Sequence, residues 1–103
     1  MEKLQVRENT IKSIQEAVAY LFGLSVEELK QESKRREVAV PRQIAIYLAK
    51  QITDASLPEI GRLFGGKHHT TVMYSIAQIE ERRRTDADLN HVISEISERL
   101  VQI

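Results

Sequence analysis

Apolar residues recur through most of this chain at intervals of three and four, which is the spacing of one face of an α-helix. The first such stripe covers residues 11–22, follows a potential cap at Thr10, and ends at Gly23, a residue type that commonly terminates helices. Residues 1–9 are expected to form a connector or tail. No segment alternates apolar and polar residues over the length of a strand, so the pattern predicts an all-α domain over residues 10–103.

Local capping signals divide the next part of the chain into two helices. Ser25 and Glu28 match a capping box, in which each side chain accepts from the other residue's backbone N–H, for a short helix that ends near Gln31. Pro41 suits the first turn of a third helix, where its missing N–H leaves no hydrogen bond unmade. The apolar stripe at 44–52 predicts that this third helix packs into the core.

A polar break separates the third helix from a short fourth one. Ser56 and Glu59 form a second capping-box pattern, and Pro58 falls within the first helical turn. Gly65 and Gly66 follow this helix and can adopt the positive φ that redirects the chain. The pattern predicts a short helix with a sharp exit.

Polar side chains open the helix that follows the double glycine. Thr70 or Thr71 can cap it, and an apolar stripe at 72–79 predicts its buried face. His68 and His69 are then left at its exposed N-terminal end. A short helix, a sharp turn and a second helix with a polar start are typical of a helix-turn-helix, whose second helix meets base edges in the major groove.

The apolar stripe at 89–100 predicts a last helix that starts at Asp86 or Asp88 and completes a compact bundle of about six helices. With 103 residues, of which 42% are hydrophobic, the chain is expected to form a single domain. It has no cysteine, no apolar run near the roughly 20 residues that cross a membrane, and no signal-peptide pattern. We expect a soluble, cytoplasmic protein without a membrane span, disulfides or thiolate zinc sites.

Charge is distributed unevenly, although the formal net charge is zero. Residues 30–84 hold 11 Lys or Arg and 6 Asp or Glu, a balance of +5. The two flanks together hold 4 and 9, a balance of −5. Because the positive excess covers the predicted helix-turn-helix, it favours an anionic partner such as nucleic acid.

Other chemistry finds little support in the sequence. Gly61–Lys67 matches the first seven positions of a phosphate-binding P-loop, but His68 replaces the required Ser or Thr and no strand precedes the segment. The adjacent His68 and His69 are expected to diverge, and only the distant His91 remains as a third imidazole. No nucleophile, base and orienting acid share a recognisable arrangement. We therefore expect neither an enzyme nor a metal or cofactor site in this chain.

Basic and amide side chains gather in a loop before the third helix, at the start of that helix, and on either side of the fourth. Each alone is typical of a solvated surface, but together, beside a reading helix, they predict contacts to a phosphate backbone. These candidates are Lys34, Arg35, Arg36, Arg42, Gln43, Lys50 and Lys67. The aromatic residues are few and spread over different helices, so we assign them to packing rather than to base stacking. They are Tyr20, Phe22, Tyr47, Phe64 and Tyr74.

Three segments in order resemble one known family. PRQIAIYL at 41–48, SLPEIGRLFGG at 56–66 and HTTV at 69–72 are similar to the C-terminal DNA-binding domain of the bacterial chromosomal replication initiator DnaA, and the resemblance extends over nearly the whole chain. It implies a helix-turn-helix like that of the Trp repressor and, as partner, double-stranded DNA carrying the short DnaA boxes of the replication origin. It also implies that ATP binds only to an ATPase module that these residues do not include.

The resemblance assigns roles to individual residues. His69, Thr70 and Thr71 match the family's HTT motif, which implies base contacts from the first two and a phosphate contact from the third. Other positions match family residues that touch the DNA backbone or the groove edge, and these contacts position the protein rather than specify sequence. They are Arg42, Gln43, Lys50, Leu57 and Pro58.

Two positions depart from the family pattern. Lys34 stands where the family usually has the arginine that enters the minor groove, and Arg35 and Arg36 are close enough to substitute for it. The commoner family pattern is GRDHTTV, whereas this chain has GKHHTTV, with His68 in place of the aspartate. A carboxylate only accepts hydrogen bonds, while a neutral imidazole donates or accepts, so the preference at one base pair is expected to differ.

Two other interpretations remain open. A stand-alone DnaA-like helix-turn-helix transcriptional regulator would use the same DNA surface as a dimer on two half-sites, with the apolar stripe of the last helix at the dimer contact. A protein-interaction module would bind no DNA and would use the acidic flanks. We expect that stripe to pack internally and the isolated domain to be a monomer.

Overall fold

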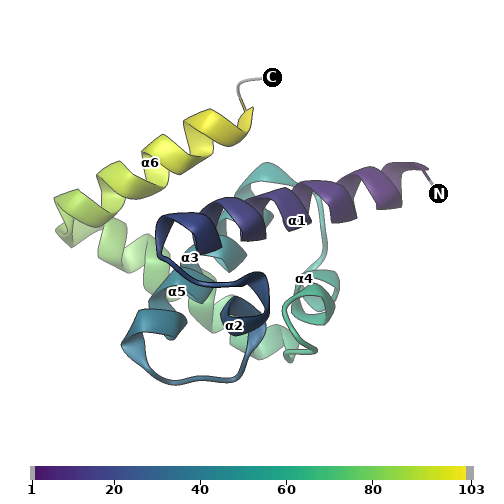
Figure 1. Ribbon diagram of the computed structural model, residues 1–103, viewed down its shortest axis with the longest axis horizontal. Coiled ribbons are helices and arrows are strands. Elements are labelled where there is room, and N and C mark those ends of the chain that lie inside the picture. Colours follow the sequence, from purple (N-terminus) through teal and green to yellow (C-terminus); the bar gives the residue numbers. More distant parts are fainter. Residues whose placement is uncertain (1, 102–103) are drawn as a thin grey trace.

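The computed structural model describes residues 2–101, which form six helices, five of them arranged around the third (Figure 1). These are α1 (Glu2–Leu21), α2 (Val26–Lys30), α3 (Arg36–Ile52), α4 (Leu57–Leu63), α5 (His69–Thr85) and α6 (Ala87–Val101). The predicted all-α bundle is confirmed, and this part of the chain contains no strand. None of its helices is long and apolar enough to cross a membrane.

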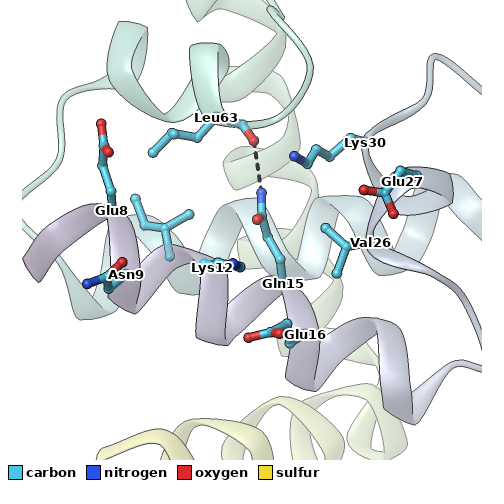
Figure 2. Close-up of a pocket in the computed structure, with 10 residues that line it drawn as sticks. Glu8, Asn9, Lys12, Gln15, Glu16, Val26, Glu27, Lys30 and Leu63 are labelled. Carbon is cyan, nitrogen blue, oxygen red and sulfur yellow. Dashed lines mark hydrogen bonds between the residues drawn. The ribbon is translucent and has the colours of Figure 1, made fainter. Parts of the chain in front are cut away.

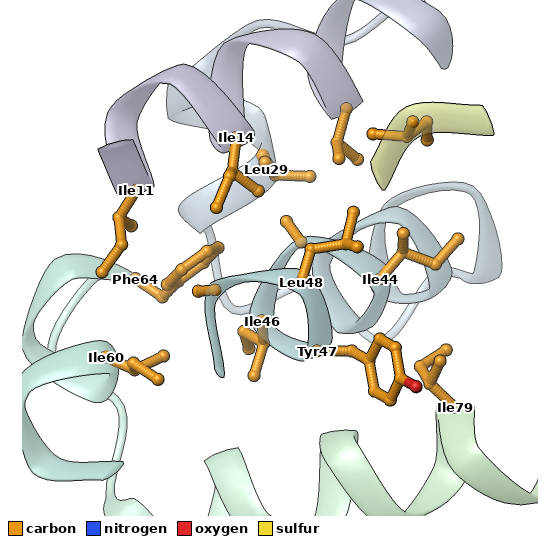
Figure 3. Close-up of a cluster of buried hydrophobic side chains, with 14 of the residues drawn as sticks. Ile11, Ile14, Leu29, Ile44, Ile46, Tyr47, Leu48, Ile60, Phe64 and Ile79 are labelled. Carbon is orange, nitrogen blue, oxygen red and sulfur yellow. The ribbon is translucent and has the colours of Figure 1, made fainter. Parts of the chain in front are cut away.

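Helix α3 forms the centre of the bundle and packs against each of the other five helices. Its residues 44–49 are buried without interruption, so this stretch is covered on every side. The apolar stripe predicted a single buried face and missed Ile46. In Figure 3, side chains from α1, α2, α4 and α5 converge on these residues, with the fully buried Phe64 among them.

Helix α6 uses its apolar stripe within the domain. Leu89, Ile93 and Ile96 are buried, and the helix packs against α1, α3 and α5. Asp86 caps it, because its Oδ1 accepts from the backbone N–H of Leu89 at 3.0 Å. The expected internal packing of the stripe is confirmed.

The expected helix start at Thr10 is wrong. Helix α1 already runs from Glu2, so residues 2–9 continue it rather than forming a separate tail. Thr10 lies inside the helix, where its Oγ1 donates to the carbonyl oxygen of Val6 at 2.9 Å. Ion pairs that join Arg7 and Glu8 to α4 stabilise the additional N-terminal turns of α1. These contacts are distant in sequence, so a local capping pattern cannot predict them.

The expected position of Pro41 in the first turn of α3 is also wrong. The helix begins at Arg36, so Pro41 is its sixth residue, is buried, and removes one interior hydrogen bond. The added turn buries Val38. Arg36 is therefore the first residue of α3, and the basic loop ends at Arg35.

Candidate nucleic-acid interface

The start of α4 is fixed by a cap and by an ion pair from α1. Ser56 Oγ accepts from the backbone N–H of Glu59 at 3.2 Å, which confirms one half of the expected capping box. The Glu59 carboxylate instead bonds Arg7, with Nε–Oε1 and Nη2–Oε1 distances of 3.1 Å, and this hydrogen bonding raises the pKa of Arg7. Arg7 also contacts Asp54 at 3.2 Å. No local sequence pattern predicted this link between α1 and the helix-turn-helix.

Two glycines allow the turn between α4 and α5 to pack closely. The backbone N–H of Lys67 donates to the carbonyl oxygen of Gly61 at 2.8 Å, and a Cβ at Gly61 would overlap the Lys67 carbonyl. Gly65 has a φ of +86°, and a Cβ there would lie 2.6 Å from the Lys30 carbonyl oxygen. Gly61 belongs to α4, so the P-loop-like segment is the end of a helix and a turn.

His68 caps α5, so the expected cap at Thr70 or Thr71 is wrong. Its Nδ1 accepts from the backbone N–H of Thr70 at 3.2 Å and lies 2.8 Å from the Thr70 hydroxyl oxygen. The helix begins at His69, one residue before the threonines. Imidazole is not among the preferred capping side chains, which explains why sequence rules favoured the hydroxyls.

Because one face of α5 is buried in the core, the polar residues at its start are exposed to solvent. Val72 and Ile79 are fully buried, as the stripe predicted, while Thr70 and Thr71 are exposed. His69 is exposed as well, but its ring does not diverge from that of His68. The two ring centroids lie 4.3 Å apart, which corrects the expectation.

Arg42 holds the basic loop against α3. Its Nη1 donates to the carbonyl oxygen of Gln31 at 2.6 Å and its Nη2 donates to that of Ser33 at 3.0 Å. Burial lowers the pKa of Arg42, and the nearby Glu32 carboxylate opposes that shift. The guanidinium therefore shapes the loop with donors that sequence reasoning had assigned to DNA phosphates.

Lys67 ties the helix-turn-helix to the end of α2. Its Nζ donates to the carbonyl oxygens of Lys30 and Phe64, both at 2.8 Å. Burial and the positive charge of Arg42 lower the pKa of Lys67, while Glu32 raises it. Like Arg42, Lys67 uses its donors on backbone carbonyl oxygens and so fixes the position of the surrounding segments.

The basic loop and the start of α5 meet in one open depression of about 470 Å³. It is lined by Glu32, Ser33, Lys34, Arg42, Gly66, Lys67, His68 and Thr71. Five predicted DNA contacts from separate parts of the chain therefore line one depression. One of the five is Lys34, whose side chain is exposed. The acidic Glu32 was missed, although it lies only two residues before Lys34 in the sequence.

The other predicted contacts lie outside this depression. Arg35 is exposed and pairs with Glu37 at 3.3 Å, and Arg36 is exposed as the first residue of α3. Lys50 is exposed and its Nζ donates to the carbonyl oxygen of Ala55 at 3.0 Å, close to the start of α4. Along the remaining edge, Gln43 and Leu57 are half-buried and Pro58 is exposed.

The aromatic residues divide into two groups. Tyr47 and Phe64 belong to the core, as expected. Tyr20, Phe22 and Tyr74 are exposed, and their assignment to packing is wrong, because each projects from the solvent side of its helix or from a turn.

A separate cavity of about 580 Å³ lies between α1, α2 and α4 (Figure 2). It is lined by Glu8, Asn9, Ile11, Lys12, Gln15, Glu16, Val26, Glu27, Lys30 and Leu63. Gln15 is buried there and its Nε2 donates to the carbonyl oxygen of Leu63 at 2.9 Å, so it holds the end of α4 (Figure 2). Within residues 2–101, no group of three His, Asp or Glu side chains has a metal-binding arrangement.

Comparisons with known proteins match this helix-turn-helix. The family described as "Bacterial dnaA protein helix-turn-helix" matches residues 11–79. The chain is 47% identical over 90 residues to the chromosomal replication initiator protein DnaA of Lactobacillus acidophilus, a match that covers 87% of this chain and 20% of that protein. It thus spans about a fifth of that relative's length.

Two solved structures are similar to the whole domain. A crystal structure of a DNA replication initiation factor superposes with a TM-score of 0.88 at 28% identity, over 98% of this chain and 31% of the other. A replication initiator DnaA bound to AMPPCP and single-stranded DNA gives a TM-score of 0.76 at 29% identity, over 96% and 31%. Sequence, fold and the arrangement of the turn agree, and the chain belongs to the bacterial DnaA helix-turn-helix family.

Proposed function

We propose that this domain binds double-stranded DNA sequence-specifically at DnaA boxes of the bacterial replication origin, as the DNA-recognition part of a replication initiator. The start of α5 enters the major groove, and the basic loop enters the adjacent minor groove. The observation that carries this proposal is the single depression in which the loop and the exposed start of α5 meet.

The exposed groups at the start of α5 suit base reading. His69 and Thr70 offer imidazole and hydroxyl groups that hydrogen-bond base edges, and Thr71 is placed for a phosphate. The buried Val72 behind them fixes the orientation of the helix. Short polar side chains on a fixed helix lose little conformational freedom on binding, which favours specificity.

The basic loop suits the neighbouring phosphates and the narrow groove. Arg42 and Lys67 fix the loop and the turn, while Lys34 and Arg35 remain exposed to contact DNA. Lys34 lines the depression and is therefore our choice for the minor-groove residue. Lys50 and Pro58 extend the footprint along the start of α4.

We also propose that the domain binds as a monomer and without a nucleotide. The stripe that a dimeric regulator would have used is packed into the bundle through Leu89, Ile93 and Ile96. No part of the proposed contact calls for a cofactor or a catalytic step. ATP in DnaA-like initiators would then act outside these residues.

The test is a fluorescence-anisotropy titration of a DnaA-box duplex and a scrambled duplex at two salt concentrations. Specific readers bind their site at least about a thousandfold more tightly than other DNA, and we expect a ratio of that size. The ratio should not change on adding ATP. Equal, weak binding to both duplexes would reduce the domain to nonspecific DNA binding, and no binding to either would favour a protein-interaction module.

A further inference from the structure

The hydrogen bond that caps α5 determines where the proton of His68 lies. The backbone N–H of Thr70 donates to Nδ1, so Nδ1 carries a lone pair and no proton. The Thr70 hydroxyl, 2.8 Å from the same nitrogen, is then also a donor to it. A neutral imidazole with an unprotonated Nδ1 has its proton on Nε2.

His68 lies in the depression that the basic loop shares with the start of α5. Lys34, Arg42 and Lys67 line the same depression and add positive charge, while Glu32 is the one carboxylate that lines it. The ring of His69 lies against His68 with its centroid 4.3 Å away.

We propose that His68 presents Nε2–H as a hydrogen-bond donor to the base that faces it, and that this reverses the preference expected for the family's aspartate. The inference rests on the proposed function. Guanine and thymine carry only acceptors among the hydrogen-bonding groups of their major-groove edges, whereas cytosine and adenine carry an amino group. A donor at position 68 can therefore bond guanine, thymine or the N7 acceptor of adenine but not the edge of cytosine, whereas a carboxylate can bond only the amino group of cytosine or adenine.

A pair of nearly identical variants separates donor from acceptor. Asn and Asp are both strong capping residues, so neither change at His68 threatens the fold. In His68→Asn, the amide oxygen caps α5 and the amide NH2 is left as a donor, as in the parent chain. In His68→Asp, one carboxylate oxygen caps α5 and the other is left as an acceptor.

The experiment selects bound sequences from a pool of random duplexes with the parent domain and with each variant. We expect one position of the selected site to change, and only in His68→Asp: the parent domain avoids cytosine there, whereas His68→Asp accepts cytosine and avoids guanine and thymine. His68→Asn should keep the parent preference. One such hydrogen bond corresponds to about a fivefold preference, which direct titration of duplexes that differ at that position would measure.

Three results would overturn the inference. If all three proteins select the same base at every position, residue 68 reads no base, although the proposed function stands. If the parent domain selects cytosine at the position that changes, the imidazole is an acceptor there and the tautomer is wrong. If none of the three selects a sequence, the proposed function fails first and the inference fails with it.

Discussion

The two ends of α5 differ in what they leave free for a partner. At its start, His69, Thr70 and Thr71 are exposed. Near its other end, about 20 Å away at 1.5 Å per residue, three consecutive arginines carry the largest run of positive charge in the helix. Charge alone would place the DNA at the arginine end.

The arginine end is instead a structural junction. Arg83 donates from Nε to Asn90 Oδ1 at 2.7 Å, from Nη1 to Tyr47 Oη at 3.1 Å and from Nη2 to Ser94 Oγ at 3.2 Å. These bonds connect α5 to α3 and α6. The comparison teaches that a run of basic residues does not by itself locate a DNA surface, because donors that are already bonded within the fold can serve the structure instead.

The largest expected effect comes from disturbing the turn that positions the reading end. Gly61→Ala places a Cβ on the Lys67 carbonyl and should lower the free energy of unfolding by about 3 kcal/mol, the upper part of the range for overpacking. Chemical denaturation measures it. Gly66→Ala is the control, because only its positive φ opposes the change and the expected loss is about 1 to 2 kcal/mol. Equal losses would mean that the close approach is unimportant.

His69→Ala should reduce discrimination between box and scrambled DNA by about 1 to 3 kcal/mol, because it removes base contacts but no core packing. Anisotropy titrations of both duplexes measure the ratio. Arg84→Ala at the other end of α5 removes a full charge and should leave the ratio unchanged. A similar loss from both variants would contradict the distinction between the two ends.

Arg83→Ala should affect stability without affecting specificity. Three hydrogen bonds from a partly exposed guanidinium correspond to about 1 to 2 kcal/mol of unfolding free energy. Thermal or denaturant unfolding gives the change, and Arg84→Ala, with one exposed ion pair, should stay within about 0.5 kcal/mol of the parent. A loss of box preference in Arg83→Ala, with stability intact, would move the DNA surface to this end.

The smallest effect is expected from Lys34. Lys34→Ala should weaken binding to every duplex. The slope of log affinity against log salt concentration should become smaller by about one unit, as expected for one lost phosphate contact. Lys67→Ala is the matched comparison, since its Nζ is occupied by two carbonyl oxygens and its loss should appear as lower stability. The assignment fails if the salt slope changes only in Lys67→Ala.

The sequence predicted the fold well where local signals agree with packing. The six helices, the double-glycine turn and the buried stripes of α5 and α6 follow from apolar spacing and from glycine. The starts of α1 and α3 did not follow, because contacts distant in sequence hold them: Arg7 to Glu59 for α1, and the burial of Val38 for α3.

The candidate site was only partly predictable for a related reason. The pattern identified basic residues near the turn but could not tell which donors are already used. Arg42 and Lys67 bond backbone carbonyls across 9 to 37 residues of sequence, and such pairs become visible only when the helices are assembled. The capping role of His68 was missed because it depends on one ring nitrogen meeting the Thr70 N–H.

The central claim is that the start of α5, and not its arginine end, meets DNA. Amide chemical shifts of the labelled domain, followed during titration with a DnaA-box duplex, test it residue by residue. We predict the largest changes at residues 68–71 and in the loop at 32–35, with small ones at residues 82–84. The largest changes at residues 82–84, with 68–71 unaffected, would contradict the account.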